Sequence, residues 1–205
     1  MKIILSCLFA VSVLFQQNVY AKEGAYPILF QASSMGYSQG GKKMETGKKI
    51  LVVFYSRSGN TERVAKDVAT AVGADTEKLI DKTKRSGVFG FIFGGRGAMR
   101  NKETELEPIK TEVSKYDIVV LGTPVWAGRM TPAIRTYINK NRDKFKTIAC
   151  IITAGSGSAL SIVPSIEELS GKKAIACIGL SGGDLKNEAK YKGKVNKFME
   201  ELRKK

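Results

Sequence analysis

The chain has 205 residues, of which 43% are apolar and 26% are charged, so it is long and apolar enough to form a globular domain with a substantial core. Lys and Arg outnumber Asp and Glu by 34 to 19, which gives a net charge of +15. Histidine is absent, and the three cysteines, Cys7, Cys150 and Cys177, are far apart. This composition excludes zinc hydrolases and catalytic triads or dyads that need His, and it excludes a disulfide scaffold or an iron–sulfur cluster.

Residues 1–21 have the pattern of a secretory signal peptide. A basic start precedes an apolar run of 13 residues at 3–15, and small or apolar residues follow at 19–21. A membrane-spanning helix needs about 20 apolar residues, so we expect export of the chain and no integral membrane span after the signal is removed. Residues 22–47 are rich in glycine and without periodicity, which predicts a linker. The alternative to a signal peptide is that the protein starts at Met44 and is cytoplasmic.

Residues 48–205 alternate short apolar runs with amphipathic segments, which is typical of βαβ units on a parallel sheet. Strands are expected at 50–55, 76–81, 117–122, 147–153 and 174–180, and the second of these, which contains Glu77 and Lys78, is expected at a sheet edge. Helices are expected at 61–72, 130–142, 160–169 and 188–202. The glycine-rich segment 85–115 predicts an irregular crossover with one short helix. Ligands of such sheets bind beside the carboxyl ends of the strands, so the loops there are the candidate sites.

The loop after the first strand, residues 56–61, reads Ser-Arg-Ser-Gly-Asn-Thr and leads directly into a helix. Its hydroxyl and amide side chains are suited to hold a phosphate at the positive end of the helix dipole, and Gly59 lets backbone N–H groups converge on it. The alternative is a hydroxyl-rich helix N-cap without a ligand. Nucleoside-triphosphate and dinucleotide loops are excluded, because their glycine motifs are missing from this position.

The loop after the third strand contains the only tryptophan of the chain, Trp126, between Pro124 and Pro132. A large ring in a turn is suited to cover a flat heteroaromatic ligand, because stacking buries area and orients the ligand. The alternative is a tryptophan that packs on the helix below it.

The pattern [ST]-x-[ST]-G-N-T at 56–61 resembles the first-strand loop of the flavodoxin family, and the resemblance covers 48–205. It implies a flavodoxin-like three-layer α/β sandwich, a five-stranded parallel sheet of order 2-1-3-4-5, and one non-covalently bound FMN. It implies that Ser56, Ser58, Asn60 and Thr61 contact the FMN phosphate, with Arg57 at a variable position and facing solvent. Trp126 would stack on the flavin ring, and the Ala127–Gly128 peptide would adapt to its redox state.

Small residues follow the fourth strand at 153–157, and in a flavodoxin their backbone N–H groups approach the pyrimidine edge of the flavin. A simple loop with a helix cap at Ser158 is the alternative. The complete set of expected cofactor-binding residues is Ser56, Arg57, Ser58, Gly59, Asn60, Thr61, Thr123, Pro124, Val125, Trp126, Ala127, Gly128, Thr153, Ala154, Gly155, Ser156 and Gly157. No catalytic residue and no metal ligand is expected.

The resemblance implies electron transfer with a redox partner protein. Two departures from the family favour an alternative, an FMN-dependent NAD(P)H:quinone-type oxidoreductase with a small quinone-like acceptor. Arg129 stands where many flavodoxins carry an acidic residue, which predicts a less negative second reduction, and the third loop lacks the Tyr that often covers the flavin. A flavin-free binding module on the same fold is a further alternative.

The positive charge favours an acidic partner. No nucleic-acid recognition motif accompanies the lysines of 186–197, so a solvated helix face is expected there. Cys150 and Cys177 are expected to be buried thiols in neighbouring strands.

Overall fold

The computed structural model describes residues 47–83 and 103–204. The expected signal peptide at 1–21, the expected linker except Gly47, and the glycine-rich part of the crossover lie outside the described residues.

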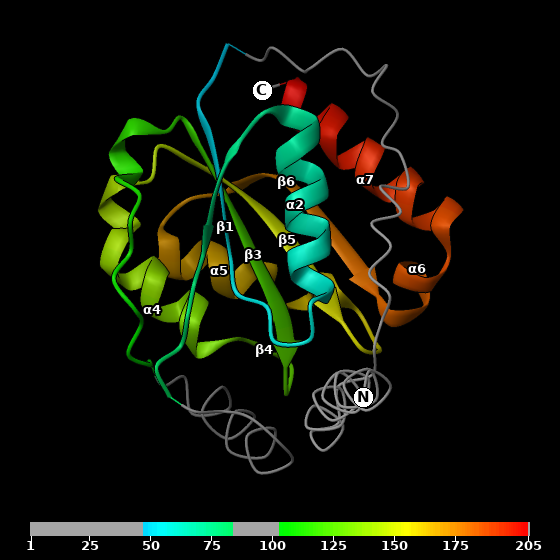
Figure 1. Cartoon of the computed structure of the whole chain (residues 1–205), viewed down its shortest axis with the longest axis horizontal. Coiled ribbons are helices and arrows are strands. Elements are labelled where there is room, and N and C mark those ends of the chain that lie inside the picture. Colours follow the sequence, from blue (N-terminus) through cyan, green and yellow to red (C-terminus); the bar gives the residue numbers. More distant parts are fainter. Residues whose placement is uncertain (1–46, 84–102, 205) are drawn as a thin grey trace, which may run out of the picture. The chain divides into compact units, whose positions relative to one another are not determined.

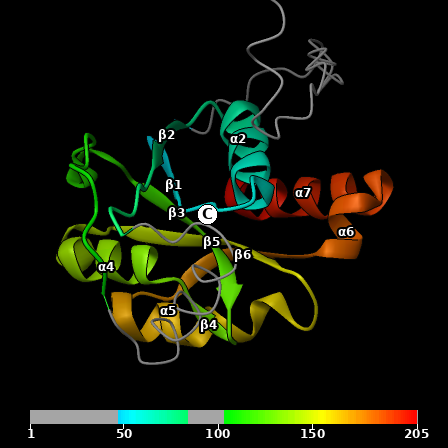
Figure 2. The same cartoon turned by 60° about the horizontal axis from the view of Figure 1, so that its bottom comes forward.

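A parallel β-sheet forms the centre of the described fold (Figures 1 and 2). Its strands, in the spatial order β2-β1-β3-β5-β6, confirm the predicted order and place the weak strand at an edge. Their bounds are β1 (Ile50–Phe54), β2 (Asp75–Lys78), β3 (Ile118–Trp126), β5 (Thr147–Ala154) and β6 (Ala174–Ser181). A two-residue strand, β4 (Arg129–Met130), pairs antiparallel with the end of β3.

Helices cover both faces of the sheet, so the fold has three layers (Figure 2). The helices α2 (Asn60–Val72) and α7 (Glu188–Arg203) pack on one face, and α4 (Pro132–Asn141) and α5 (Val163–Ser170) pack on the other. All four were predicted. Helix α2 buries Val64, Val68 and Val72 at helical spacing and ends at Gly73, whose φ of 66° is in the left-handed region that favours glycine.

Several helical segments differ from the prediction. The helix expected at 160–169 is divided into a 3-10 turn, η3 (Ala159–Ile162), and α5, because a proline lies in the first turn of α5 and cannot donate a backbone hydrogen bond to the preceding turn. A short helix, α6 (Gly182–Lys186), was not predicted, and it is stabilised by a capping box between Ser181 and Asp184. The described residues also contain the 3-10 turns η1 (Val113–Lys115) and η2 (Arg142–Lys144).

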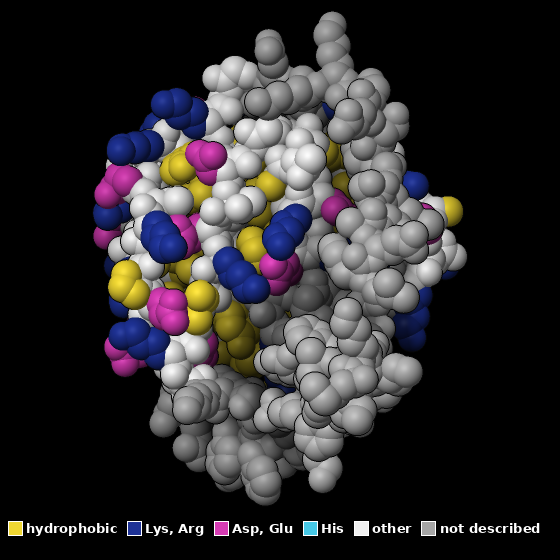
Figure 3. Space-filling model, in the orientation of Figure 1, with side chains coloured by type: hydrophobic (Ala, Val, Ile, Leu, Met, Phe, Trp, Pro, Cys, Tyr) yellow, Lys and Arg dark blue, Asp and Glu magenta, His cyan; other side chains and the backbone are white. Residues whose placement is uncertain are grey.

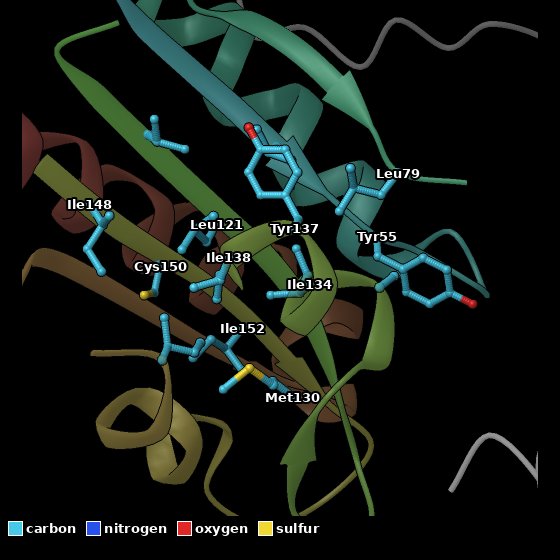
Figure 4. Packing of buried hydrophobic residues seen from close by; sticks show 14 of the residues in the cluster. Tyr55, Leu79, Leu121, Met130, Ile134, Tyr137, Ile138, Ile148, Cys150 and Ile152 are labelled. Atoms are coloured by element: carbon cyan, nitrogen blue, oxygen red, sulfur yellow. The ribbon is translucent and has the colours of Figure 1, made fainter. Parts of the chain in front are cut away.

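Apolar residues of the central strands are buried on both faces, as a sheet between two helical layers requires. On the face toward α4, Leu121, Cys150 and Ile152 pack with Ile134 and Tyr137, as Figure 4 shows. On the opposite face, Val52, Val120 and Ile151 belong to a second apolar cluster, which also contains residues of α2 and α7. This rigid core holds the carboxyl ends of β1, β3 and β5 side by side.

Neither a membrane-spanning helix nor a metal-binding group occurs in the described part of the chain. No helix there is long and apolar enough to cross a bilayer. No cluster of three or more Cys, Asp or Glu side chains there could hold a metal ion.

Candidate functional site

A cavity of about 380 Å³ lies at the carboxyl ends of β1, β3 and β5, which is the lower edge of the sheet in Figure 1. The strand order reverses between β1 and β3, and this switch point is where α/β sheets of this kind bind ligands. Three loops far apart in the sequence contribute the walls. The lining residues are Arg57, Ser58, Asn60, Pro124, Val125, Trp126, Thr153, Ala154 and Gly155.

All nine lining residues belong to the set expected from the sequence, and the other eight lie nearby in the chain. Ser56, Thr61 and Thr123 are partly or fully buried, and Gly59 precedes α2. Ala127 and Gly128 form the tip of the β3–β4 hairpin, and Ser156 and Gly157 are exposed in the loop after β5. The structure thus brings the three predicted loops together around one cavity.

The start of α2 has the features of an anion-binding helix end. Gly59, at φ 85°, occupies the N-cap position, and no side chain caps the helix. The hydroxyl groups of the loop therefore do not act as the helix cap that was the alternative prediction. The Arg63 N–H is the donor that bonds to the Gly59 carbonyl, so the amides of the first turn before Arg63 have no acceptor within the helix. Such amides are available to an anion.

The hydroxyl of Ser56 is buried and has no hydrogen-bond partner among the described residues. A buried hydroxyl without a partner costs about 1–3 kcal/mol, so proteins rarely keep one without a reason. Ser56 follows Tyr55 at the end of β1 and begins the loop that leads into α2. Its unused oxygen is the feature of this loop that most directly indicates a ligand-binding role.

Two buried hydroxyl pairs fix the loops with respect to one another. The side chains of Thr61 and Thr153 share a hydrogen bond of 2.8 Å between the first and third loops. The hydroxyls of Thr123 and Thr131 lie 3.1 Å apart and connect the two sides of the second loop. The positions of the cavity walls are therefore set before a ligand binds.

Residues 123–126 were expected in a turn, but they continue β3 and form a hairpin with β4. The turn consists of Ala127 and Gly128 alone, with φ of 47° and 73°. Positive φ at both central residues is typical of the two-residue turns that match the twist of a hairpin. At Ala127 this conformation costs about 1 kcal/mol, because its Cβ crowds the following carbonyl.

The hairpin holds Trp126 against the cavity. Its ring meets the ring of Tyr55 edge to face, with centroids 5.6 Å apart and an interplanar angle of 85°. Part of Trp126 also packs on the apolar cluster below, as the alternative expected, and its role in covering a flat ligand stays a prediction. In the sequence, Tyr55 is an ordinary strand residue, since only the fold places it beside Trp126.

The third loop is supported by a residue that no sequence motif indicated. A Cβ at Gly182 would lie 3.1 Å from the carbonyl oxygen of Gly155, so the start of α6 packs closely on this loop. Ser158 occupies the N-cap position of η3 without a side-chain cap bond, which does not support the alternative of a loop built around a helix cap.

The cavity has a positive electrostatic environment. Arg57, expected to face solvent, is exposed but lines the cavity, and none of the lining residues is acidic. Glu62, in the first turn of α2, forms ion pairs with Lys66 and Lys78, and its hydrogen bonds to them lower the pKa of its carboxyl group. An anionic group is therefore favoured here.

Similar solved structures were found, although no family model matches the chain. A flavoprotein from Lactobacillus acidophilus NCFM, solved in complex with FMN, is 20% identical, with a TM-score of 0.56 over 74% of this chain and 98% of that chain. A candidate flavoprotein from Bacteroides uniformis ATCC 8492 is 22% identical, with a TM-score of 0.53 over 69% of this chain and 92% of that one. Rubredoxin oxygen:oxidoreductase from Desulfovibrio gigas is 16% identical, with a TM-score of 0.51 over 79% of this chain and 36% of that chain.

Proposed function

We propose that this chain, whose fold is flavodoxin-like, binds FMN in the cavity at the switch point and acts in electron transfer. The observation that carries the proposal is the convergence of three loops on one cavity, with the unpartnered Ser56 hydroxyl and the uncapped start of α2 at one side. A similar structure was solved with FMN bound, which supports the choice of cofactor.

The residues fit the two chemically different parts of FMN. The phosphate would be held by Ser56, Ser58, Asn60 and Thr61 together with the first amides of α2, where the helix dipole favours negative charge. The positive charge of Arg57 would offset that of the phosphate. The ring would be held between the second and third loops, against Trp126 and the small residues Ala154 and Gly155.

FMN supplies the redox chemistry when bound, and the protein orients it and sets its potentials. Trp126, fixed by Tyr55, would orient the ring. The Ala127–Gly128 turn lies beside Trp126, and Gly128 can change its backbone conformation at low steric cost. The positive charge of Arg129, paired with Trp126 across the hairpin, would favour added negative charge on the ring.

A carrier role is favoured over catalysis by the chemistry of the cavity wall. Arg57 is the one ionisable residue in the described part of its lining, and an arginine does not exchange protons near neutral pH. Among the described residues, the wall therefore offers no side chain for general acid–base catalysis. The second candidate, a quinone-type oxidoreductase, is favoured by the absence of an aromatic side chain in the loop after β5, which leaves one flavin face open to a flat acceptor.

The first experiment tests cofactor binding. The purified full-length protein should show the visible absorption of an oxidised flavin, and mass spectrometry after denaturation should identify the released molecule as FMN. The apoprotein should bind FMN with a stoichiometry of one. A colourless protein that does not bind FMN on titration would leave the flavin-free binding module as the remaining function.

The second experiment separates the carrier from the oxidoreductase. The FMN-loaded protein should not oxidise NADH or NADPH with a quinone under steady-state conditions, although it should exchange electrons with a chemical reductant. Steady turnover would instead assign the oxidoreductase function.

The partner is proposed from charge. The chain carries a net charge of +15, and Lys186, Lys190 and Lys197 are exposed near or on α7, as expected of a solvated helix face. Basic and acidic side chains are interspersed on the described part of the face drawn in Figure 3. We therefore favour an acidic redox protein, whose association should weaken as salt is added.

Export directed by residues 1–21 also stays a proposal, which amino-terminal sequencing of the native protein would test.

A further inference from the structure

Two cysteines of the core lie directly opposite each other on neighbouring strands. Cys150 of β5 is the register partner of Cys177 of β6, and both side chains belong to the apolar cluster on the α4 and α5 face of the sheet. Neighbouring strands are about 4.8 Å apart, which lies within the Cα separation of about 4.4–6.8 Å that a disulfide requires. The spacing of paired strands is therefore compatible with a disulfide between these two residues.

The strand register is irregular immediately before this pair. Ile148 pairs with Ala174 and Cys150 pairs with Cys177, so β6 has one residue more than β5 between the two points. A bulge of this kind increases the local twist and re-aims the next side chain. Because β6 is the last strand of the sheet, Cys177 has a strand neighbour on one side only.

The two thiols differ in access and in acidity. Cys150 is buried, whereas Cys177, also expected to be buried, is partly exposed at the edge strand. Their mutual hydrogen bond lowers the pKa of Cys177, and the same bond and burial raise the pKa of Cys150. The carboxylate of Glu167, on α5, opposes ionisation of both thiols, but it forms an ion pair with Lys173 and accepts a bond from the Ala174 amide. Cys177 is thus the reactive thiol, with Cys150 behind it.

We propose that Cys150 and Cys177 form a redox-active pair that a small-molecule disulfide oxidises to a disulfide between β5 and β6. The Cys177 thiolate attacks one sulfur of the reagent, whose S–S bond breaks and releases one thiolate, which takes a proton. Cys150 then loses its proton to solvent and attacks the Cys177 sulfur, which displaces the second reagent thiolate. Two protein thiols are oxidised to one disulfide, and one reagent disulfide is reduced to two thiols.

The test uses the folded, full-length protein and 2-hydroxyethyl disulfide. After the remaining thiols are alkylated, trypsin separates the cysteines into peptides 147–172 and 174–186, with Cys7 in a third peptide. The amount of cross-linked peptides 147–172 and 174–186 should exceed the amount of mixed disulfide on Cys177 by about tenfold or more. The reason is that a neighbouring thiol has a far higher effective concentration than millimolar reagent. Circular dichroism at each time point shows that the protein stays folded.

Two variants assign the order of the steps. Cys150→Ala should stop at the mixed disulfide on Cys177, whereas Cys177→Ala should leave Cys150 unmodified in the folded protein. If Cys150→Ala does not fold, the product ratio of the wild type decides the question alone. A folded wild type that stops at the mixed disulfide, or that keeps both thiols while the urea-unfolded chain forms the cross-link, would overturn the proposal.

Discussion

Removal of the Ser56 hydroxyl should change stability and cofactor affinity in opposite directions. In the apoprotein the Ser56 oxygen is buried without a partner in the described part of the chain, so Ser56→Ala removes an uncompensated polar group. In the FMN complex the same hydroxyl would donate a hydrogen bond to a phosphate oxygen, and the alanine variant would lose that bond. An ordinary structural serine would not show these opposite effects.

The expected sizes follow from the two environments. An unsatisfied buried hydroxyl costs about 1–3 kcal/mol, so the apoprotein should become more stable by about 1 kcal/mol or more. A hydrogen bond to a charged group contributes about 1.5–3 kcal/mol, so the Kd for FMN should rise by about 10-fold to 150-fold. Urea unfolding of the apoprotein measures the first quantity, and quenching of flavin fluorescence on titration measures the second.

Thr111 offers a matched control, because its hydroxyl is also buried without a partner but does not line the cavity. The isosteric change Thr111→Val keeps the backbone N–H that donates to Glu77 at 3.1 Å. This variant should also be more stable by about 1 kcal/mol, with an unchanged Kd for FMN. If Ser56→Ala binds FMN as tightly as the wild type, the phosphate is not held at Ser56 and the argument fails.

Three further predictions test packing, redox tuning and ion pairing. Gly122→Ala would place a Cβ 2.7 Å from the Cβ of Phe54 and should lower the free energy of urea unfolding by about 1–3 kcal/mol. The control Gly193→Ala, in open space on α7, should raise that free energy by up to about 1 kcal/mol, and equal effects of the two variants would contradict the close approach of β1 and β3. Arg129→Glu should make the second reduction potential of bound FMN more negative by about 40 mV or more, since a nearby charge contributes on the order of 1 kcal/mol. An unchanged potential in a potentiometric titration would place Arg129 away from the ring. Lys194 and then Ser181 donate hydrogen bonds to Asp184, which lower the pKa of its carboxyl group from 3.8. The carboxylate therefore contributes stability at pH values above 3.8, and this contribution is lost as the pH falls further. Asp184→Asn should reduce this loss in acid unfolding, and an identical pH profile would show that these bonds do not stabilise the fold.

Local sequence patterns were sufficient to predict the sheet and the loops of the site. Runs of β-branched residues identify β1, β3, β5 and β6, because strands covered on both faces need apolar side chains at nearly every position. The segment 56–61 identified the loop before α2, because a tight turn and a helix start depend on neighbouring residues. The prediction placed the end of β3 too early, since Thr123 and Pro124 still pair with β5 and the last two residues of the strand pair with β4.

The sequence by itself determined which residues could form strands, helices and a ligand loop, since these properties depend on neighbours along the chain. Only the tertiary structure decided which distant residues meet. It placed Tyr55 against Trp126, joined Thr61 to Thr153, and set Gly182 beneath Gly155. It also paired Cys150 with Cys177 through the register of β5 and β6. Such contacts depend on strand order, register and helix packing, which are set by the burial of the whole core and leave no local pattern.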